Sequence, residues 1–196
     1  MTTLNNPPVN IRQQVIDEAK KLAVDVLYSE KGHFAAAGRW SSIHLWIGIP
    51  STVLAACAGA GFFTGIWSWI PSLLAFAASA LSAIATFLNP RSTWNRYHQA
   101  GVRYGIIRRQ LRQFINVDAA LSEEDGKLAH ELKKFTEEIA KLQLESPAIP
   151  AYAYKSAGLS IVAGSATYTE ADMRAAMGHP SNSATETKAS EGGRIV

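Results

Sequence analysis

Residues 40–90 read WSSIHLWIGIPSTVLAACAGAGFFTGIWSWIPSLLAFAASALSAIATFLNP and contain no Asp, Glu, Lys or Arg. A bilayer core is about 30 Å thick, and a helix that rises about 1.5 Å per residue crosses it in roughly 20 residues. These 51 residues therefore suffice for two crossings and a tight turn. A soluble domain rarely continues for so long without a surface charge, so the stretch predicts a membrane hairpin.

The two predicted spans cover residues 43–63 and 70–88, with the turn at Thr64-Gly65. An indole has an apolar body and a polar N–H, so tryptophan favours the boundary between lipid and water. All five tryptophans fall near a predicted boundary: Trp40, Trp46, Trp67, Trp69 and Trp94. The alternative, a buried pair of core helices in a soluble protein, is disfavoured because both stretches reach spanning length together.

Basic residues flank the hairpin on its outer sides. Acidic residues are absent between Lys31 and Val117, and the turn between the spans is uncharged. The positive-inside rule then places both termini in the cytoplasm. Since the inner leaflet is anionic, the arginines after the second span are predicted to lie at the membrane surface. They are Arg91, Arg96, Arg103, Arg108, Arg109 and Arg112. Nucleic acid is not expected as a partner, because no recognised nucleic-acid motif accompanies these charges.

Helical periodicity continues on both sides of the hairpin. Residues 9–30 have apolar side chains at three-to-four spacing and predict an amphipathic helix. A second helix continues past Pro90 with an apolar stripe of Tyr104, Ile107, Leu111 and Phe114. Ser-Glu-Glu-Asp at 122–125 resembles a capping box that opens a third helix. The third helix carries a heptad seam of Leu128, Leu132, Phe135, Ile139 and Leu142. Such a seam packs against another helix, either in the same chain or in a neighbouring one.

The predicted fold is an all-α membrane protein, with a two-helix transmembrane hairpin and a cytosolic helical bundle. Residues 1–42 form a cytosolic amphipathic helix and juxtamembrane segment, and residues 43–89 form the hairpin. Cytosolic helices follow at 90–146. Residues 147–196 form a tail that is partly disordered, because small polar residues dominate its end at 178–196.

The sequence has no catalytic pattern. Its five histidines are scattered, and no pair has the spacing of a zinc helix or zinc finger. A Walker phosphate loop and a dinucleotide-binding glycine fingerprint are both missing. The single cysteine, Cys57, lies inside the first predicted span and cannot form an intrachain disulfide. We therefore expect a protein that is not an enzyme and has no cofactor or metal.

Small and hydroxylated residues recur along one face of the second span at steps of three and four. They are Ser72, Ala75, Ser79, Ser82 and Thr86. A similar rhythm occurs in the first span at Gly48, Thr52, Ala55 and Gly59. Small residues let helices approach closely, and hydroxyl groups can bond across an interface or face water. The stripe therefore indicates either packing within the hairpin or the lining of a pore, and a pore would require several copies of the chain.

Motifs around the hairpin resemble those of the SLATT domain, the SMODS- and SLOG-associating two-transmembrane effector domain. They begin with Tyr28-Ser-Glu-Lys-Gly-His33-Phe34, followed by Trp40 and His44, and by Leu45-Trp-Ile-Gly-Ile-Pro50 at the start of the first span. Phe87-Leu-Asn-Pro90 and His98-Gln-Ala-Gly101 follow the second span, before an arginine-rich helix. The resemblance covers roughly residues 9–145, and it rests on the order of these motifs.

The resemblance implies a membrane effector of a bacterial conflict or anti-phage system, which oligomerises and permeabilises the inner membrane when triggered. Because the chain lacks a sensor domain, the trigger is expected to come from a separate sensor or from a nucleotide signal. The family's juxtamembrane motif corresponds to Tyr28, Lys31, His33 and Phe34. Either these residues relay a signal at the membrane surface, or Tyr28 and Phe34 pack in the bundle while Lys31 and His33 meet lipid headgroups. The alternative function is a membrane-anchored helical interaction module that conducts nothing.

Overall fold

A computed structural model describes residues 10–63, 69–167 and 173. The predicted turn at Thr64-Gly65, Trp67 and the predicted disordered end at 178–196 lie outside the described residues. Within the described residues the chain forms helices and connecting segments, with no strand. The chain divides into two units, Met1–Gly158 and Leu159–Val196.

The first helix, α1, is continuous from Ile11 to Phe63. The sequence predicted two elements here, an amphipathic helix at 9–30 and a separate span from 43, and that division is wrong. The segment between them contains the strong helix formers Ala35, Ala36 and Ala37 and has no proline. Pro50 lies inside the helix without ending it.

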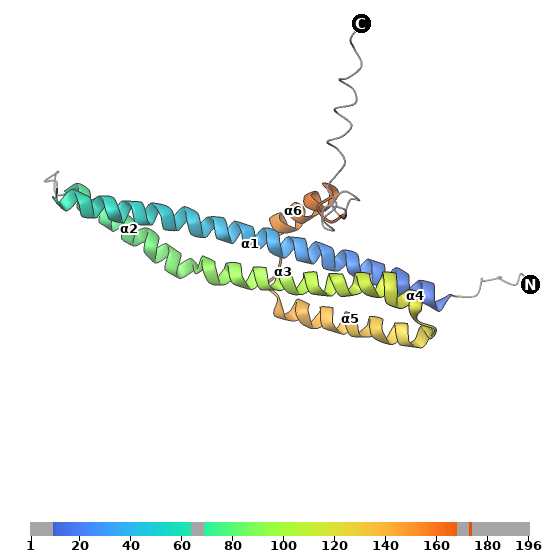
Figure 1. Ribbon diagram of the computed structural model, residues 1–196. Coiled ribbons are helices and arrows are strands. Elements are labelled where there is room, and N and C mark those ends of the chain that lie inside the picture. The colour runs from blue at the N-terminus through green and yellow to red at the C-terminus, as the bar shows by residue number, and fades with distance from the viewer. Residues whose placement is uncertain (1–9, 64–68, 168–172, 174–196) are drawn as a thin grey trace, which may run out of the picture. The chain divides into compact units, whose positions relative to one another are not determined.

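The predicted second span is α2, Trp69–Leu88, and the single residue Asn89 separates it from α3, Pro90–Gln113. Figure 1 shows α3 following α2 along the same side of α1. Asn89 has a left-handed backbone with φ of 41°, which asparagine tolerates better than most residues. Its side-chain oxygen accepts a hydrogen bond from the Ser92 amide, and Pro90 occupies the first position of α3, where proline is favoured. The predicted interruption at Asn89-Pro90 is confirmed.

Residues 43–63 of α1 and the whole of α2 form an antiparallel pair, which we call the apolar hairpin. The register follows from two contacts: the Ser51 hydroxyl donates to the Ala78 carbonyl over 3.1 Å, and Gly61 lies against Pro71. Both helices are long and apolar enough to cross a membrane, and only 6% and 11% of their most apolar windows are buried within the chain. The apolar hairpin is therefore not a buried core within the described part of the chain, unlike the buried pair of core helices that the alternative requires.

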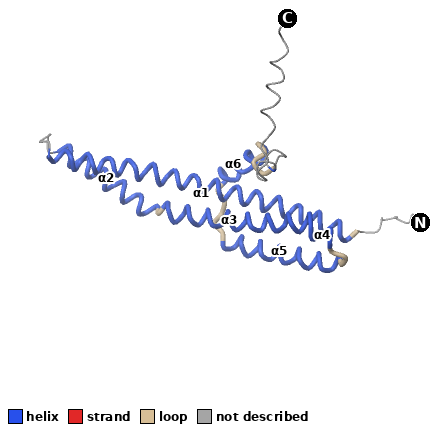
Figure 2. Tube along the Cα trace, viewed as in Figure 1, coloured by secondary structure: helices blue, strands red, loops and turns tan. Residues whose placement is uncertain are grey.

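Residues 11–42 of α1 pack against α3, the short helix η1 (Phe114–Asp118) and α5 (Asp125–Glu145), and also against α4 (Ala119–Leu121) through Ala119. Figure 2 shows α3 and α5 running alongside α1. We call this part the bundle. The predicted stripe on α3 is confirmed, because Tyr104, Ile107 and Leu111 are all buried, as is Phe114 of η1. The π-helical turn of η1 was not predicted from the sequence.

The α5 seam packs within the chain. Its members Leu128, Ile139 and Leu142 are buried in two clusters with residues of α1, α3 and η1, and Phe135 packs against both clusters. The predicted capping box is wrong, because Glu124 is the N-cap and makes no side-chain capping bond. Arg12 of α1 holds this turn instead, with its guanidinium contacting the Asp125 carboxylate at 3.0 Å and the Ser122 carbonyl at 2.6 Å.

Helix α6 covers Ala151–Val162 and lies inside the segment predicted as a tail. Within the first unit, its residues Ala153 and Ala157 are buried. In the second unit the helix ends in a Schellman motif, with Gly164 at a φ of 87°. The Gly164 amide donates to the Ile161 carbonyl, and the Ser165 amide donates to the Ser160 carbonyl. The alanine-rich start and the glycine after the helix are the signals that the tail interpretation overlooked.

Candidate functional site

The apolar hairpin is closed by a seam in which small side chains alternate with larger apolar ones. On α2 the buried residues are Pro71 and Ala78, with Leu74, Leu81 and Ala85 partly buried at helical spacing. On α1 the matching residues are Ile47, Ser51, Leu54, Ala58 and Gly61. A Cβ atom added at Gly61 would lie 2.8 Å from Pro71 Cγ, so this glycine permits the close approach of the two helices.

The predicted small-residue stripe is not part of this seam. Ser72, Ser79, Ser82 and Thr86 are exposed and Ala75 is only partly buried, because each follows a seam position by one residue. One residue turns a helix by about 100°, which moves the stripe away from the partner helix. The interpretation of the stripe as packing within the hairpin is therefore wrong for the single chain.

The stripe on α1 is displaced from the seam in the same way. Thr52, Ala55 and Gly59 are exposed and Gly48 is partly buried, again one residue after each seam position. Because the two helices are antiparallel, the same forward step turns both stripes toward the same side of the hairpin. Together the nine residues of the two stripes form one continuous surface, which we call the small face.

Hydroxyl groups on the small face bond to their own helices. Ser79 Oγ donates to the Ala75 carbonyl and Thr86 Oγ1 to the Ser82 carbonyl, both over 2.9 Å. Thr52 Oγ1 donates to the Gly48 carbonyl over the same distance. These bonds satisfy the hydroxyl hydrogens in an apolar surrounding, and the oxygens keep lone pairs that can accept from water or from another chain.

His33 is the most deeply buried polar side chain of the bundle, with an exposed fraction of 1%. Its Nδ1 lies 2.7 Å from the Ser29 carbonyl oxygen, and its Nε2 lies 3.2 Å from the carbonyl oxygen of Pro147. The ring stacks on Tyr104 at 5.1 Å between centroids. His33 does not meet lipid headgroups, so that expectation is wrong; it connects α1 with the segment between α5 and α6.

Further contacts fasten the same segment, residues 146–150, which we call the strap. The Tyr97 hydroxyl donates to the Ala148 carbonyl over 3.0 Å, and Ile149 fills the space left by the missing side chain of Gly32. Burial raises the pKa of Tyr97 and of Tyr104 above the usual value of 10.0, so both phenols stay protonated and can donate at neutral pH.

One helical turn from His33, the Glu30 carboxylate forms an ion pair with Arg108 of α3 at 2.7 Å. The side chains are 11% and 22% exposed, so the pair is largely removed from water. Sequence reasoning missed Glu30. The available signal was its position as the last acidic residue before a long stretch rich in arginine and free of acids.

The remaining residues of the predicted juxtamembrane motif lie in the bundle. Tyr28 is partly buried and stacks on Tyr154 of α6 at 5.5 Å. Phe34 packs its ring against Gly101 of α3, where an added Cβ would lie 3.1 Å from the ring. The expected packing of these two aromatic residues is confirmed. Lys31 is partly buried as well.

The predicted membrane-surface arginines differ in their surroundings. Arg91 and Arg96 are exposed in the first turns of α3, next to the apolar hairpin. Arg103 is exposed and pairs with Glu145 of α5 at 2.7 Å. Arg108 pairs with Glu30, which lies about 20 Å along α1 from the start of the apolar segment. Arg109 and Arg112 follow on exposed positions of the same helix.

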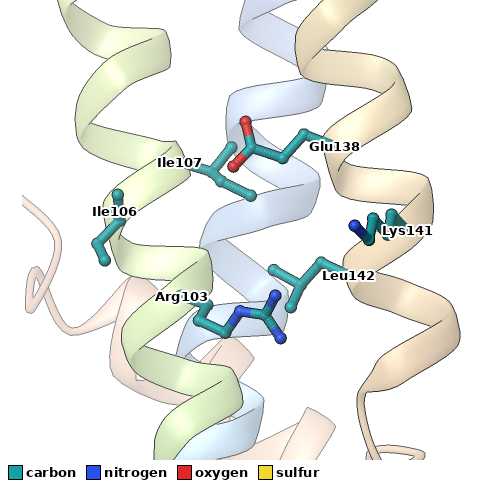
Figure 3. A pocket seen from close by; sticks show the side chains of 6 residues that line it. All are labelled: Arg103, Ile106, Ile107, Glu138, Lys141 and Leu142. Carbon is teal, nitrogen blue, oxygen red and sulfur yellow. The ribbon is translucent and has the colours of Figure 1, made fainter.

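A surface hollow of about 250 Å³ lies between α3 and α5 (Figure 3). Ile107 and Leu142 form its floor, while Arg103, Glu138 and Lys141 surround it with both signs of charge. This mixture does not define a ligand. Over the described part of the chain, no group of three His, Cys, Asp or Glu residues could hold a metal ion.

Comparison of the chain with protein-family models, with curated proteins and with solved structures finds no match.

Proposed function

We propose that the protein is a two-span effector of a bacterial anti-phage or conflict system, located in the inner membrane with both termini in the cytoplasm. On a signal from a separate sensor or a nucleotide, several copies assemble and permeabilise the membrane. Lipid, further copies of the chain and the sensor are its partners. Enzymatic activity, a cofactor and nucleic-acid binding play no part in this proposal.

The observation that carries the proposal is the small face. A hairpin that only anchors a bundle has no need for a face of glycine, serine and threonine directed away from its own seam. Such a face favours close contact with another hairpin or with water, since small residues and hydroxyls serve both purposes in apolar surroundings. The resemblance of the surrounding motifs to the SLATT domain supports the same function.

The strap provides a route for activation. In the resting state His33 and Tyr97 bind the carbonyls of Pro147 and Ala148, and this holds α5 and α6 against α1 and α3. A sensor that displaces the strap removes its contacts with Gly32 and His33 and so loosens the part of α1 that leads into the predicted first span. Because α1 is continuous, its movement rotates or shifts the first span and allows the small faces of several copies to meet.

The experiment compares wild type with Ser79→Leu/Ser82→Leu in cells that contain the trigger. Both positions are exposed near the middle of α2, and leucine keeps the span apolar, so insertion is retained. We expect wild type to depolarise the membrane and admit dye, and the double variant to leave the membrane polarised at equal abundance. Ala80→Leu is the control, because Ala80 is also exposed but lies about 100° away from Ser79 on the helix.

The outcomes separate the two candidate functions. Loss of permeability in the double variant and not in Ala80→Leu supports a role of the small face in the pore or its assembly. Equal loss in both variants would mean that added bulk anywhere on α2 is harmful. Should triggered wild type bind its sensor and leave the membrane sealed, the non-conducting anchored module becomes the better account.

A further inference from the structure

A small hollow lies where the apolar hairpin meets the bundle. Its volume is about 220 Å³, and its lining consists of Ser41 and His44 from α1 and Arg91 and Trp94 from α3. Arg91 is the first charged residue after the uncharged stretch, and Arg39 is the last one before it. The hollow therefore lies at the level where lipid headgroups begin if the hairpin crosses a bilayer.

The lining offers donors and positive charge. Arg91 carries a permanent charge, and over the described residues it has no ion pair with a carboxylate. The imidazole of His44 and the hydroxyl of Ser41 add hydrogen-bond donors, and the first turn of α3 adds the partial positive charge of a helix N-terminus. A phosphate group satisfies all of these groups together, since arginine binds its oxygens in a bidentate manner.

Two features point to a phosphate that carries an apolar tail. Trp94 closes one side of the hollow, and its ring is held by stacking on His98 at 5.0 Å between centroids. Ser41 lies seven residues before Gly48, so it points to nearly the same side of α1 as the small face. An acyl chain bound at this hollow would extend along the shallow surface formed by Gly48 and Thr52.

We propose that this hollow binds the phosphate of an anionic glycerophospholipid, whose acyl chain lies on the lower part of the small face. The proposal rests on the two-span placement but not on pore formation. In the resting protein the lipid covers residues that would otherwise contact a second hairpin. Assembly of the proposed pore then requires that the lipid moves or becomes part of the interface.

Native mass spectrometry of the full chain in detergent, titrated with phosphatidylglycerol, tests the site. We expect saturable binding of one lipid to wild type, weakened roughly five- to tenfold in His44→Gln/Arg91→Gln, because the loss of the Arg91 charge beside an anionic group has a several-fold effect and the loss of the imidazole removes a hydrogen-bonding group. Arg96→Gln is the matched control, since Arg96 is an exposed arginine of the same helix outside the hollow. Circular dichroism checks that each variant keeps its helices.

The same titration with phosphatidylcholine and with soluble glycerophosphoglycerol shows whether the bound phosphate must belong to an anionic lipid. Weaker binding of the zwitterionic lipid and of the soluble headgroup supports an anionic lipid. The proposal is overturned if Arg96→Gln weakens binding as much as the double variant, or if the double variant binds like wild type. Soluble headgroup that binds as tightly as the lipid would overturn it in favour of a simple anion site. Because these measurements need no trigger, the site can fail while the pore proposal stands, and the reverse also holds.

Discussion

At the residue scale, Arg108 of the arginine-rich helix α3 places its positive charge inside the bundle. Arg108 meets Glu30 across the α1–α3 interface, and both side chains are largely removed from water. An ion pair of this kind contributes little relative to two well-packed apolar side chains, but removal of one partner leaves an uncompensated charge in a poor solvent. In the exposed pair between Arg103 and Glu145, removal of one partner costs little, because water solvates the remaining charge.

We therefore expect Glu30→Ala to lower the free energy of unfolding of the bundle by about 2–3 kcal/mol. Glu145→Ala should lower it by less than about 1 kcal/mol. In Glu30→Met/Arg108→Met most of the stability should return. Thermal and denaturant unfolding in detergent, followed by circular dichroism, measures all three. A loss in Glu30→Ala no larger than in Glu145→Ala would contradict the buried ion pair.

At the element scale, α5 carries leucines both inside its heptad seam, where they are buried, and outside it, where they are exposed. Leu128 lies at 2% exposure in a cluster with Phe114 and Ala19, whereas Leu144 at the other end of the helix is 90% exposed. Both are leucines on the same helix, so they differ only in surroundings. This difference makes them a matched pair for a test of whether α5 packs within its own chain.

Leu128→Ala should cost about 2–5 kcal/mol of bundle stability, since it removes a buried side chain and leaves a cavity. Leu144→Ala should change stability by less than about 0.5 kcal/mol. The measurement is the unfolding transition together with the molar mass from light scattering. A drop in mass with unchanged stability in Leu128→Ala would instead place the seam between chains.

At the scale of the whole molecule, the proposed topology places the turn between α1 and α2 outside the cell. In a Cys57→Ser background, we expect an impermeant thiol reagent to label Thr64→Cys in intact cells, because this position lies between the two spans in the sequence. Ser156→Cys, on the exposed side of α6, should be labelled only after lysis. Labelling of Ser156→Cys in sealed cells would overturn the topology.

The sequence by itself determined the helical class, the apolar hairpin and most of the bundle core. An uncharged stretch of spanning length and apolar residues at three-to-four spacing are local patterns, so they can be read without neighbours in space. The stripe from Tyr104 to Phe114, the buried members of the α5 seam and the interruption at Asn89-Pro90 all follow from such patterns. The small stripe itself was also visible in the sequence.

Only the tertiary structure decided which way the small stripes point and which charged side chains form ion pairs inside the bundle. A small stripe has the same spacing whether it packs in a seam or beside it, and the choice depends on the contacts of Ser51 and Gly61 with α2. Likewise, the sequence pattern predicts His33 and Arg108 as surface residues. In the fold, the strap covers His33 and Glu30 pairs with Arg108, and both partners come from distant parts of the chain. The rotation of each helix is set by packing with its neighbours, which periodicity along one helix cannot specify.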